Sequence, residues 1–371
     1  MISHKCEGIV EFVNFHGDEL PDKVKEIIFY GGCLDYLFDK QRPVIVRTDI
    51  NILEVQEDRT LKYVEQGKEA NRTFIVGTYQ RSIELNDFNT LPAKEVYFKI
   101  QFEKPTTLSE LPFYYSLIHL LVRFMTNRYD VSFREVRLTT DVGRVRYPDG
   151  RLFVRDTTEM VSLVEGTCLT FQDLGWTMMN LLAIFTRQVR KNGKTTNDYS
   201  LDFIPHNEEI GYLRNETICN ISGALEYEVS QNKDIKNLRD QEIDKFAREI
   251  RRYIKEKYKE YNVPEEALDL MCGSTQNWSL SAKERFIALA DKHREAMEQL
   301  KKRIFDGQYY DIGVFVKHRN QVMHSASTPP TIEVVGTALI LRGLVYCSIL
   351  SRAGMSEEDI TRLAKEDRIN P

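Results

Sequence analysis

The pattern of apolar residues changes part-way along this chain of 371 residues, and the change limits its fold more than any other feature. In the first half, short runs rich in Val, Ile, Phe, Tyr and Thr show partial alternation between turn residues, which is typical of strands. From about residue 208 onward, apolar residues recur every three or four positions, which is typical of helices. The sequence therefore predicts an α+β protein, with a β-rich part followed by an all-α part.

We expect the first part, residues 1–190, to be a sandwich-like or barrel-like β domain with an inserted helix. The helix is predicted over residues 109–127, and a further helix over residues 176–188 closes the domain. Because this half carries no catalytic motif, a sensor or regulatory role is expected for it. The predicted strands are residues 8–15, 43–55, 73–85, 93–103, 131–140 and 144–155.

The second part, residues 208–371, follows a linker at residues 191–198 and reads as a helical bundle. One helical stripe begins at Ile243 and Phe246, and another begins at Phe286 and Leu289. An apolar helix over residues 334–350 carries Arg342 at its centre and is short for a bilayer, so a buried helix is predicted rather than a membrane span.

Composition excludes several classes of protein. Apolar residues make up 42% of the chain and charged residues 29%, as in a soluble globular protein, and the net charge of −5 does not indicate a general nucleic-acid binder. The six cysteines form no C-x-x-C pair, no His, Cys or Asp cluster has metal-ligand spacing, and Cys33 is predicted to be a small buried residue. The N-terminus shows no secretory h-region. We therefore expect a cytoplasmic protein without membrane association, cofactor or metal.

A short motif near the C-terminus suggests chemistry. Arg319 and His324 are separated by four residues, and a polar amide, Asn320, directly follows the arginine. RNA carries its own nucleophile, the 2′-hydroxyl, so metal-free cleavage needs a group that exchanges protons near neutral pH and a cation for the phosphate. Histidine and arginine supply these two functions.

The position of Arg319 on its helix gives the motif weight. At about 100° per residue, Arg319 falls within an apolar arc, where a charged residue is uncommon unless it is paired or functional. The alternative is a structural arginine bonded to a carboxylate, with His324 as an ordinary residue at the helix end. Both interpretations remain open. The arc comprises Ile312, Phe315, Val316, Val322 and Met323.

A helical C-terminal part whose late helix carries R-N-x-x-x-H, followed by a loop and an apolar helix, resembles the HEPN superfamily. In that family R-x(4–6)-H is the ribonuclease signature, and Arg319, Asn320 and His324 match it position for position. Residues 221–228 also resemble an early helix of such bundles. A β-rich half ahead of the bundle is similar in layout to ApeA-like anti-phage proteins.

The resemblance implies a metal-independent ribonuclease that acts as a homodimer through the C-terminal bundle, with two R-x(4–6)-H motifs facing each other. It also implies RNA, with tRNA favoured, as substrate in phage defence or a toxin system, and a phage-derived trigger or an antitoxin as partner. Family members that lose activity act as binding modules. The alternative function is therefore a catalytically silent module whose β domain recognises a phage protein, a carbohydrate or a nucleotide.

Further residues are candidates for supporting roles. Glu226 is a candidate to pair with Arg319 or to orient the histidine, and His318 is either a member of the site or a solvated side chain. A basic cluster on the helix near residue 250 is either an RNA-binding surface or a solvated face, since glutamates interrupt it. The residues of this cluster that we favour for RNA contact are Arg248, Arg251, Arg252 and Lys255.

Overall fold

The computed structural model describes residues 10–15, 23–38, 60–65, 71–80, 94–140, 150–154, 167–191, 203–204, 213–236, 241–261, 263–275, 281–325 and 328–369. The chain divides into two compact units. The first comprises Met1–Tyr212 together with Ile349–Pro371, and the second comprises Leu213–Ser348. The last residues of the chain were predicted to belong to the second part, whereas the structure groups Ile349–Pro371 with the first.

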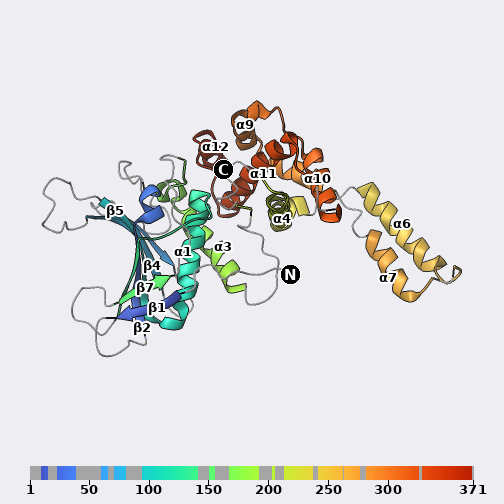
Figure 1. The fold of residues 1–371 in the computed structure, drawn as a ribbon. Coiled ribbons are helices and arrows are strands. Elements are labelled where there is room, and N and C mark those ends of the chain that lie inside the picture. Colours follow the sequence, from blue (N-terminus) through green and yellow to red (C-terminus); the bar gives the residue numbers. More distant parts are fainter. Residues whose placement is uncertain are drawn as a thin grey trace. The chain divides into compact units, whose positions relative to one another are not determined.

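The first unit is built on one antiparallel sheet (Figure 1). Its described strands follow the order β1-β7-β6-β2-β5-β4-β3, so the central strands β2 and β5 are neighbours in space although β3 and β4 separate them in the chain. The strands are β1 (Val10–Phe15), β2 (Lys23–Tyr30), β3 (Leu61–Glu65), β4 (Arg72–Gln80), β5 (Lys94–Thr107), β6 (Glu135–Thr139) and β7 (Gly150–Val154).

Four α-helices accompany the sheet in the described part of this unit, and α1 lies along one of its faces (Figure 1). Phe29 of β2 lies 6.2 Å from Tyr115 between ring centroids, and Phe102 of β5 lies 4.8 Å from Tyr114. Alternate side chains of a strand point to the same face of a sheet. Phe29 and Phe102 point to the face that α1 covers, and both are buried there. The helices are α1 (Leu111–Thr126), α2 (Phe171–Leu174), α3 (Thr177–Lys191) and α12 (Glu357–Lys365).

This arrangement corrects the predicted architecture. The described strands form one open sheet and not a sandwich or barrel, because helices rather than a second sheet cover its apolar face. The predicted strands other than residues 43–55, which lie outside the described residues, overlap β1, β4, β5, β6 and β7. Strands β2 and β3 were missed. The helices predicted over residues 109–127 and 176–188 correspond to α1 and α3.

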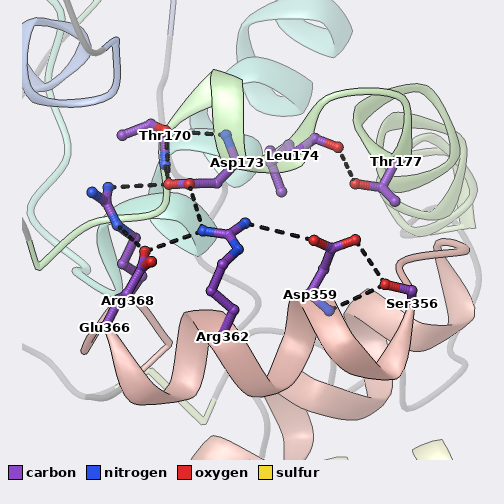
Figure 2. A network of polar contacts seen from close by, with 9 residues as sticks. All are labelled: Thr170, Asp173, Leu174, Thr177, Ser356, Asp359, Arg362, Glu366 and Arg368. Atoms are coloured by element: carbon purple, nitrogen blue, oxygen red, sulfur yellow. Dashed lines mark hydrogen bonds and ion pairs between the residues drawn. The ribbon is translucent and has the colours of Figure 1, made fainter. Parts of the chain in front are cut away.

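A buried carboxylate bonds the C-terminal segment to the rest of the first unit (Figure 2). Asp173 of α2 has a side chain that is 1% exposed, and it accepts a 3.1 Å hydrogen bond from Nη1 of Arg368. It also accepts bonds from the backbone N–H of Thr170 at 3.0 Å and from its hydroxyl at 2.7 Å. Arg362 of α12 lies 3.7 Å from the second carboxylate oxygen. One side chain therefore caps α2 and bonds the last residues of the chain.

The second unit is helical throughout its described part. Short 3-10 turns lie at Phe305–Gly307 here, and at Gly32–Tyr36 and Leu108–Glu110 in the first unit. The α-helices are α4 (Asn215–Gln231), α5 (Lys233–Lys236), α6 (Gln241–Lys257), α7 (Glu265–Ser274), α8 (Ala282–Lys292), α9 (Arg294–Arg303), α10 (Ile312–Ser325) and α11 (Ile332–Arg352), whose last residues, from Ile349 on, belong to the first unit.

Helix α11 lies in the interior. It is the one described helix long and apolar enough to cross a membrane, but 83% of its most apolar stretch is buried, which favours a core helix. Gly343 allows α9 to approach closely, since a Cβ there would lie 2.6 Å from Cδ1 of Leu300. Arg342 is 4% exposed, and this burial lowers its pKa to about 10. Ser348 donates a 3.0 Å hydrogen bond to the buried carboxylate of Glu228.

Candidate functional site

Helix α10 carries the arginine–histidine motif, and a side-chain cap marks the start of the helix. Asp311 precedes the helix, and its Oδ1 accepts bonds from the backbone N–H of Gly313 at 2.6 Å and of Val314 at 3.2 Å. This is the bonding of an N-terminal cap, which satisfies backbone donors that have no partner within the helix. The helix expected to carry Arg319 is thus confirmed as α10, Ile312–Ser325.

The buried face of α10 differs from the predicted apolar arc. Ile312 and Phe315 are buried as expected, but Met323 is 63% exposed. His318, for which the alternative was a solvated side chain, is only 5% exposed. The inward face therefore centres near Phe315, with His318 on one flank and Arg319 on the other. The prediction placed the centre of the arc at Arg319 because it gave Met323 the same weight as the buried residues.

His318 connects α10 to the start of α4. Its Nε2 lies 2.9 Å from Oδ1 of Asn215, and Nδ2 of Asn215 donates a 2.9 Å bond to the carbonyl of Thr328. Because the amide nitrogen of Asn215 donates to the carbonyl of Thr328, the atom that faces His318 is the amide oxygen, which can only accept a hydrogen bond. Nε2 of His318 therefore carries the proton. Burial lowers the pKa of His318, which favours the neutral ring. The Asn215 side chain thereby fixes the backbone that follows α10.

Arg319 lies on the other flank of α10 and is bonded to two side chains. Its Nη2 donates to Oε1 of Glu226 on α4 at 2.8 Å, and its Nη1 donates to Oδ1 of Asn320 at 3.1 Å. The side chain of Arg319 is 25% exposed and that of Glu226 is 44% exposed, so solvent reaches the pair. The predicted pairing of Glu226 with Arg319 is confirmed as a contact. The structure thus brings Arg319, Asn320 and Glu226 together at a partly exposed position.

Cys219 of α4 lies near this cluster. Its burial raises the pKa of the thiol, while the positive charge of Arg319 opposes the rise and Glu216 adds to it. A thiol with a raised pKa is a poor nucleophile at neutral pH. Cys33 of the first unit is 1% exposed, as predicted, and burial raises its pKa to about 11. Neither thiol is therefore a candidate nucleophile.

His324 lies in the last turn of α10. Its side chain lies outside the described residues. Along an ideal helix, position 324 is about 140° around the axis from position 319, so the backbone of one copy of α10 directs the two positions of the motif apart.

The basic residues proposed for RNA contact lie on α6, and two of them bond backbone carbonyls of that helix. The Nε of Arg248 donates to the carbonyl of Asp244 at 3.2 Å, and that of Arg251 donates to the carbonyl of Ala247 at 3.2 Å. Arg252 and Lys255 are exposed. These side chains are accessible.

The second unit also contains a pocket of about 280 Å³, and it is lined by none of the motif residues. Lys301 crosses it with Nζ 4.6 Å from the ring centroid of Tyr310 and 2.9 Å from Oε1 of Glu298. The charged residues of its lining form two ion pairs, Lys301 with Glu298 and Arg294 with Asp291. The lining residues are Ile287, Ala290, Asp291, Arg294, Met297, Glu298, Lys301, Tyr310 and Ile312.

Within the described part of the chain, no group of three or more His, Cys, Asp or Glu side chains could hold a metal ion. Asn215 was not predicted as a functional residue, because its partners His318 and Thr328 lie 103 and 113 residues away in the chain.

Comparison of the chain with family models, with curated proteins and with solved structures finds no match. The site's residues therefore have to be interpreted from their own chemistry.

Proposed function

We propose that the second unit is a metal-independent RNA endonuclease of HEPN type. One observation carries the proposal: the guanidinium of Arg319 is held at a partly exposed position by Glu226 and Asn320, on the helix whose last turn carries His324. A fixed cation of this kind suits a phosphate that gains negative charge in the transition state.

In the proposed mechanism, the 2′-hydroxyl of the substrate attacks the adjacent phosphorus and the bond to the 5′-oxygen of the next nucleotide breaks. His324 takes the proton from the hydroxyl or gives one to the leaving oxygen. Arg319 stabilises the phosphorane-like transition state, and Asn320 orients the phosphate or the histidine. Glu226 acts as a positioning residue, because its carboxylate holds the guanidinium in place.

The proposal extends to the setting of the reaction. The substrate would be tRNA or another host RNA in the cytoplasm, in phage defence or a toxin system. The enzyme would be a homodimer through the second unit. The first unit would restrain it until a phage-derived trigger arrives, or an antitoxin would do so.

The same ion pair favours the second candidate, a catalytically silent binding module. In the structure the guanidinium of Arg319 already has a carboxylate partner, Glu226 at 2.8 Å, as a purely structural arginine would. In that case the first unit would recognise a phage protein, a carbohydrate or a nucleotide.

The discriminating experiment incubates the purified full chain with total tRNA in EDTA and analyses the ends of the products. Attack by the 2′-hydroxyl leaves 2′,3′-cyclic phosphate and 5′-hydroxyl ends. Such ends support the enzyme. Intact RNA across many substrates would support the binding module, and an absolute requirement for Mg²⁺ would exclude the proposed mechanism.

A further inference from the structure

Exposed apolar side chains concentrate on the helical pair α6 and α7, which pack against each other. Among the described residues, six of the large exposed apolar side chains lie between residues 243 and 271. On α6, Ile243 is 41% exposed, and Phe246 and Tyr253 are each 54% exposed. Large apolar side chains that are exposed along one face of a helix indicate an interaction site. The other three are Tyr261, Leu270 and Met271.

Four apolar residues of α6 follow a seven-residue repeat, of which Ile243, Phe246 and Tyr253 are exposed and Ile250 is half-buried. Ile243 and Ile250 occupy one position of the repeat, and Phe246 and Tyr253 occupy another, so that the spacing alternates between three and four residues. This is the pattern of the seam with which one helix packs along another in a coiled coil. Lys257 takes the next position and ends the seam after two repeats.

One edge of this seam is acidic. Glu242, Glu249 and Glu256 are seven residues apart, and all three are exposed. They precede the seam positions 243, 250 and 257, so at about 100° per residue they form a row along one border. On the other border Ala247 is 1% exposed, so that border is covered within the protein. A partner helix would therefore meet an apolar seam with a glutamate row on its open side.

Apart from Lys257 at the end of the seam, the basic residues of α6 lie away from it. Arg248 and Lys255 fall about 180° from the seam. A phosphate-bearing partner lying on the seam would face glutamates rather than these cations. Lipid headgroups and nucleic acids are therefore poorly matched to this surface.

We propose that the seam of α6 is a docking site for an amphipathic helix of another protein, with apolar residues in heptad spacing and Lys or Arg residues beside them. Helix-in-groove recognition and edge charges set the choice of partner in such pairs. The charge pattern argues against a second copy of this chain as the occupant. Two α6 helices packed antiparallel would place their glutamate rows opposite each other, and like charges there are unfavourable. The site is independent of the proposed ribonuclease chemistry.

Two synthetic helical peptides test this proposal on the full chain. Both have three heptads with Ile and Leu in the seam, and one carries Lys at the flanking positions where the other carries Glu. We expect the lysine peptide to bind at least about ten times more tightly at low salt, measured by fluorescence anisotropy. Raising the salt should reduce the difference, because screening weakens exposed charge pairs.

Reversing the charge of the glutamate row is the more decisive test. The variant with Glu242→Lys, Glu249→Lys and Glu256→Lys should prefer the glutamate peptide, since the changed side chains are exposed and the seam is intact. A matched variant with Arg248→Glu and Lys255→Glu on the opposite side of α6 should keep the preference for the lysine peptide. Thermal melting of each variant establishes that it is folded.

The proposal is overturned if the chain binds the two peptides equally, binds neither, or keeps its preference after the charge swap. Self-association of the chain that is lost in Phe246→Ser would also overturn it, because the seam would then be an interface between copies.

Discussion

The guanidinium of Arg319 and the carboxylate of Glu226 meet at 2.8 Å between α10 and α4, two helices that are far apart in the sequence. The contact joins the helix that carries the arginine–histidine motif to the first helix of the second unit. In the proposed enzyme it orients the one cation that would face the phosphate. Its effect on stability and its effect on activity can be separated by substitution.

Replacing Glu226 should lower activity more than stability. The pair is partly exposed, and such ion pairs contribute up to about 1 kcal/mol, so Glu226→Ala should shift the unfolding midpoint little. Cleavage of tRNA should fall because Arg319 loses its main orienting partner. Glu226→Gln keeps a carbonyl oxygen that can accept the bond and should retain more activity than Glu226→Ala. Equal activity of wild type and Glu226→Ala would remove the positioning role.

Stability of the second unit should depend on pH through His318. Burial lowers the pKa of His318 in the folded chain below its ordinary value of 6.5, which applies in the unfolded chain. At a pH between these two pKa values, the unfolded chain binds more protons than the folded one. Stability should therefore fall as the pH drops below about 6.5, and this group should add no pH dependence above it. Urea unfolding at pH 5.5 and 7.5 measures the effect. His318→Gln should show a smaller difference between the two pH values, and an unchanged difference would contradict the assignment.

Asp173→Ala should destabilise the first unit strongly. Its carboxylate is 1% exposed and bonds both Thr170 and Arg368, so its removal leaves buried donors without an acceptor. Breaking a buried pair in this way costs about 3–5 kcal/mol. Melting followed by circular dichroism should show a transition many degrees lower. The matched change Glu366→Ala removes a more exposed carboxylate and should have a much smaller effect. Similar melting of both variants would contradict the importance of Asp173.

Assembly into a homodimer with a shared site can be tested by mixing variants. Positions 319 and 324 diverge by about 140° around one helix, whereas a two-fold axis brings two copies of each around one groove. A chain with Arg319→Ala mixed with a chain with His324→Ala should regain part of the activity that each alone lacks. Mass measurement in solution should give a dimer. An active strict monomer would end the idea of a composite site.

The sequence predicted local structure better than it predicted contacts. The α10 helix and its cap follow from residues near one another, as does α1, whose apolar residues recur at helical spacing. Strand β2 was missed because Lys23, Lys25 and Glu26 interrupt its apolar residues. Those charged side chains are tolerated because Lys23 and Lys25 are exposed and Glu26 is only half-buried. Glu26, for example, bonds Lys99 at 3.4 Å on the neighbouring strand.

Long-range bonds could not be read from local patterns. Asp173 and Arg368 are 195 residues apart, and nothing near either residue identifies the other. For the same reason the sequence assigned the C-terminal segment to the helical part, although it groups with the first unit. The apolar stripe of α6 was correctly predicted to be helical. Its exposure could not be predicted, because apolar residues that face a partner and apolar residues that face a core recur at the same spacing.

The measurement that tests the central claim most directly is the rate of tRNA cleavage in EDTA by the wild type, Arg319→Ala, His324→Ala and Lys317→Ala. Lys317 is an exposed residue of the same helix and serves as the matched control. We predict that each of the first two substitutions lowers the rate by about 100- to 1000-fold, as loss of a charge-stabilising group does. Lys317→Ala should cleave within a few-fold of the wild type. Full activity of either Arg319→Ala or His324→Ala would contradict the account.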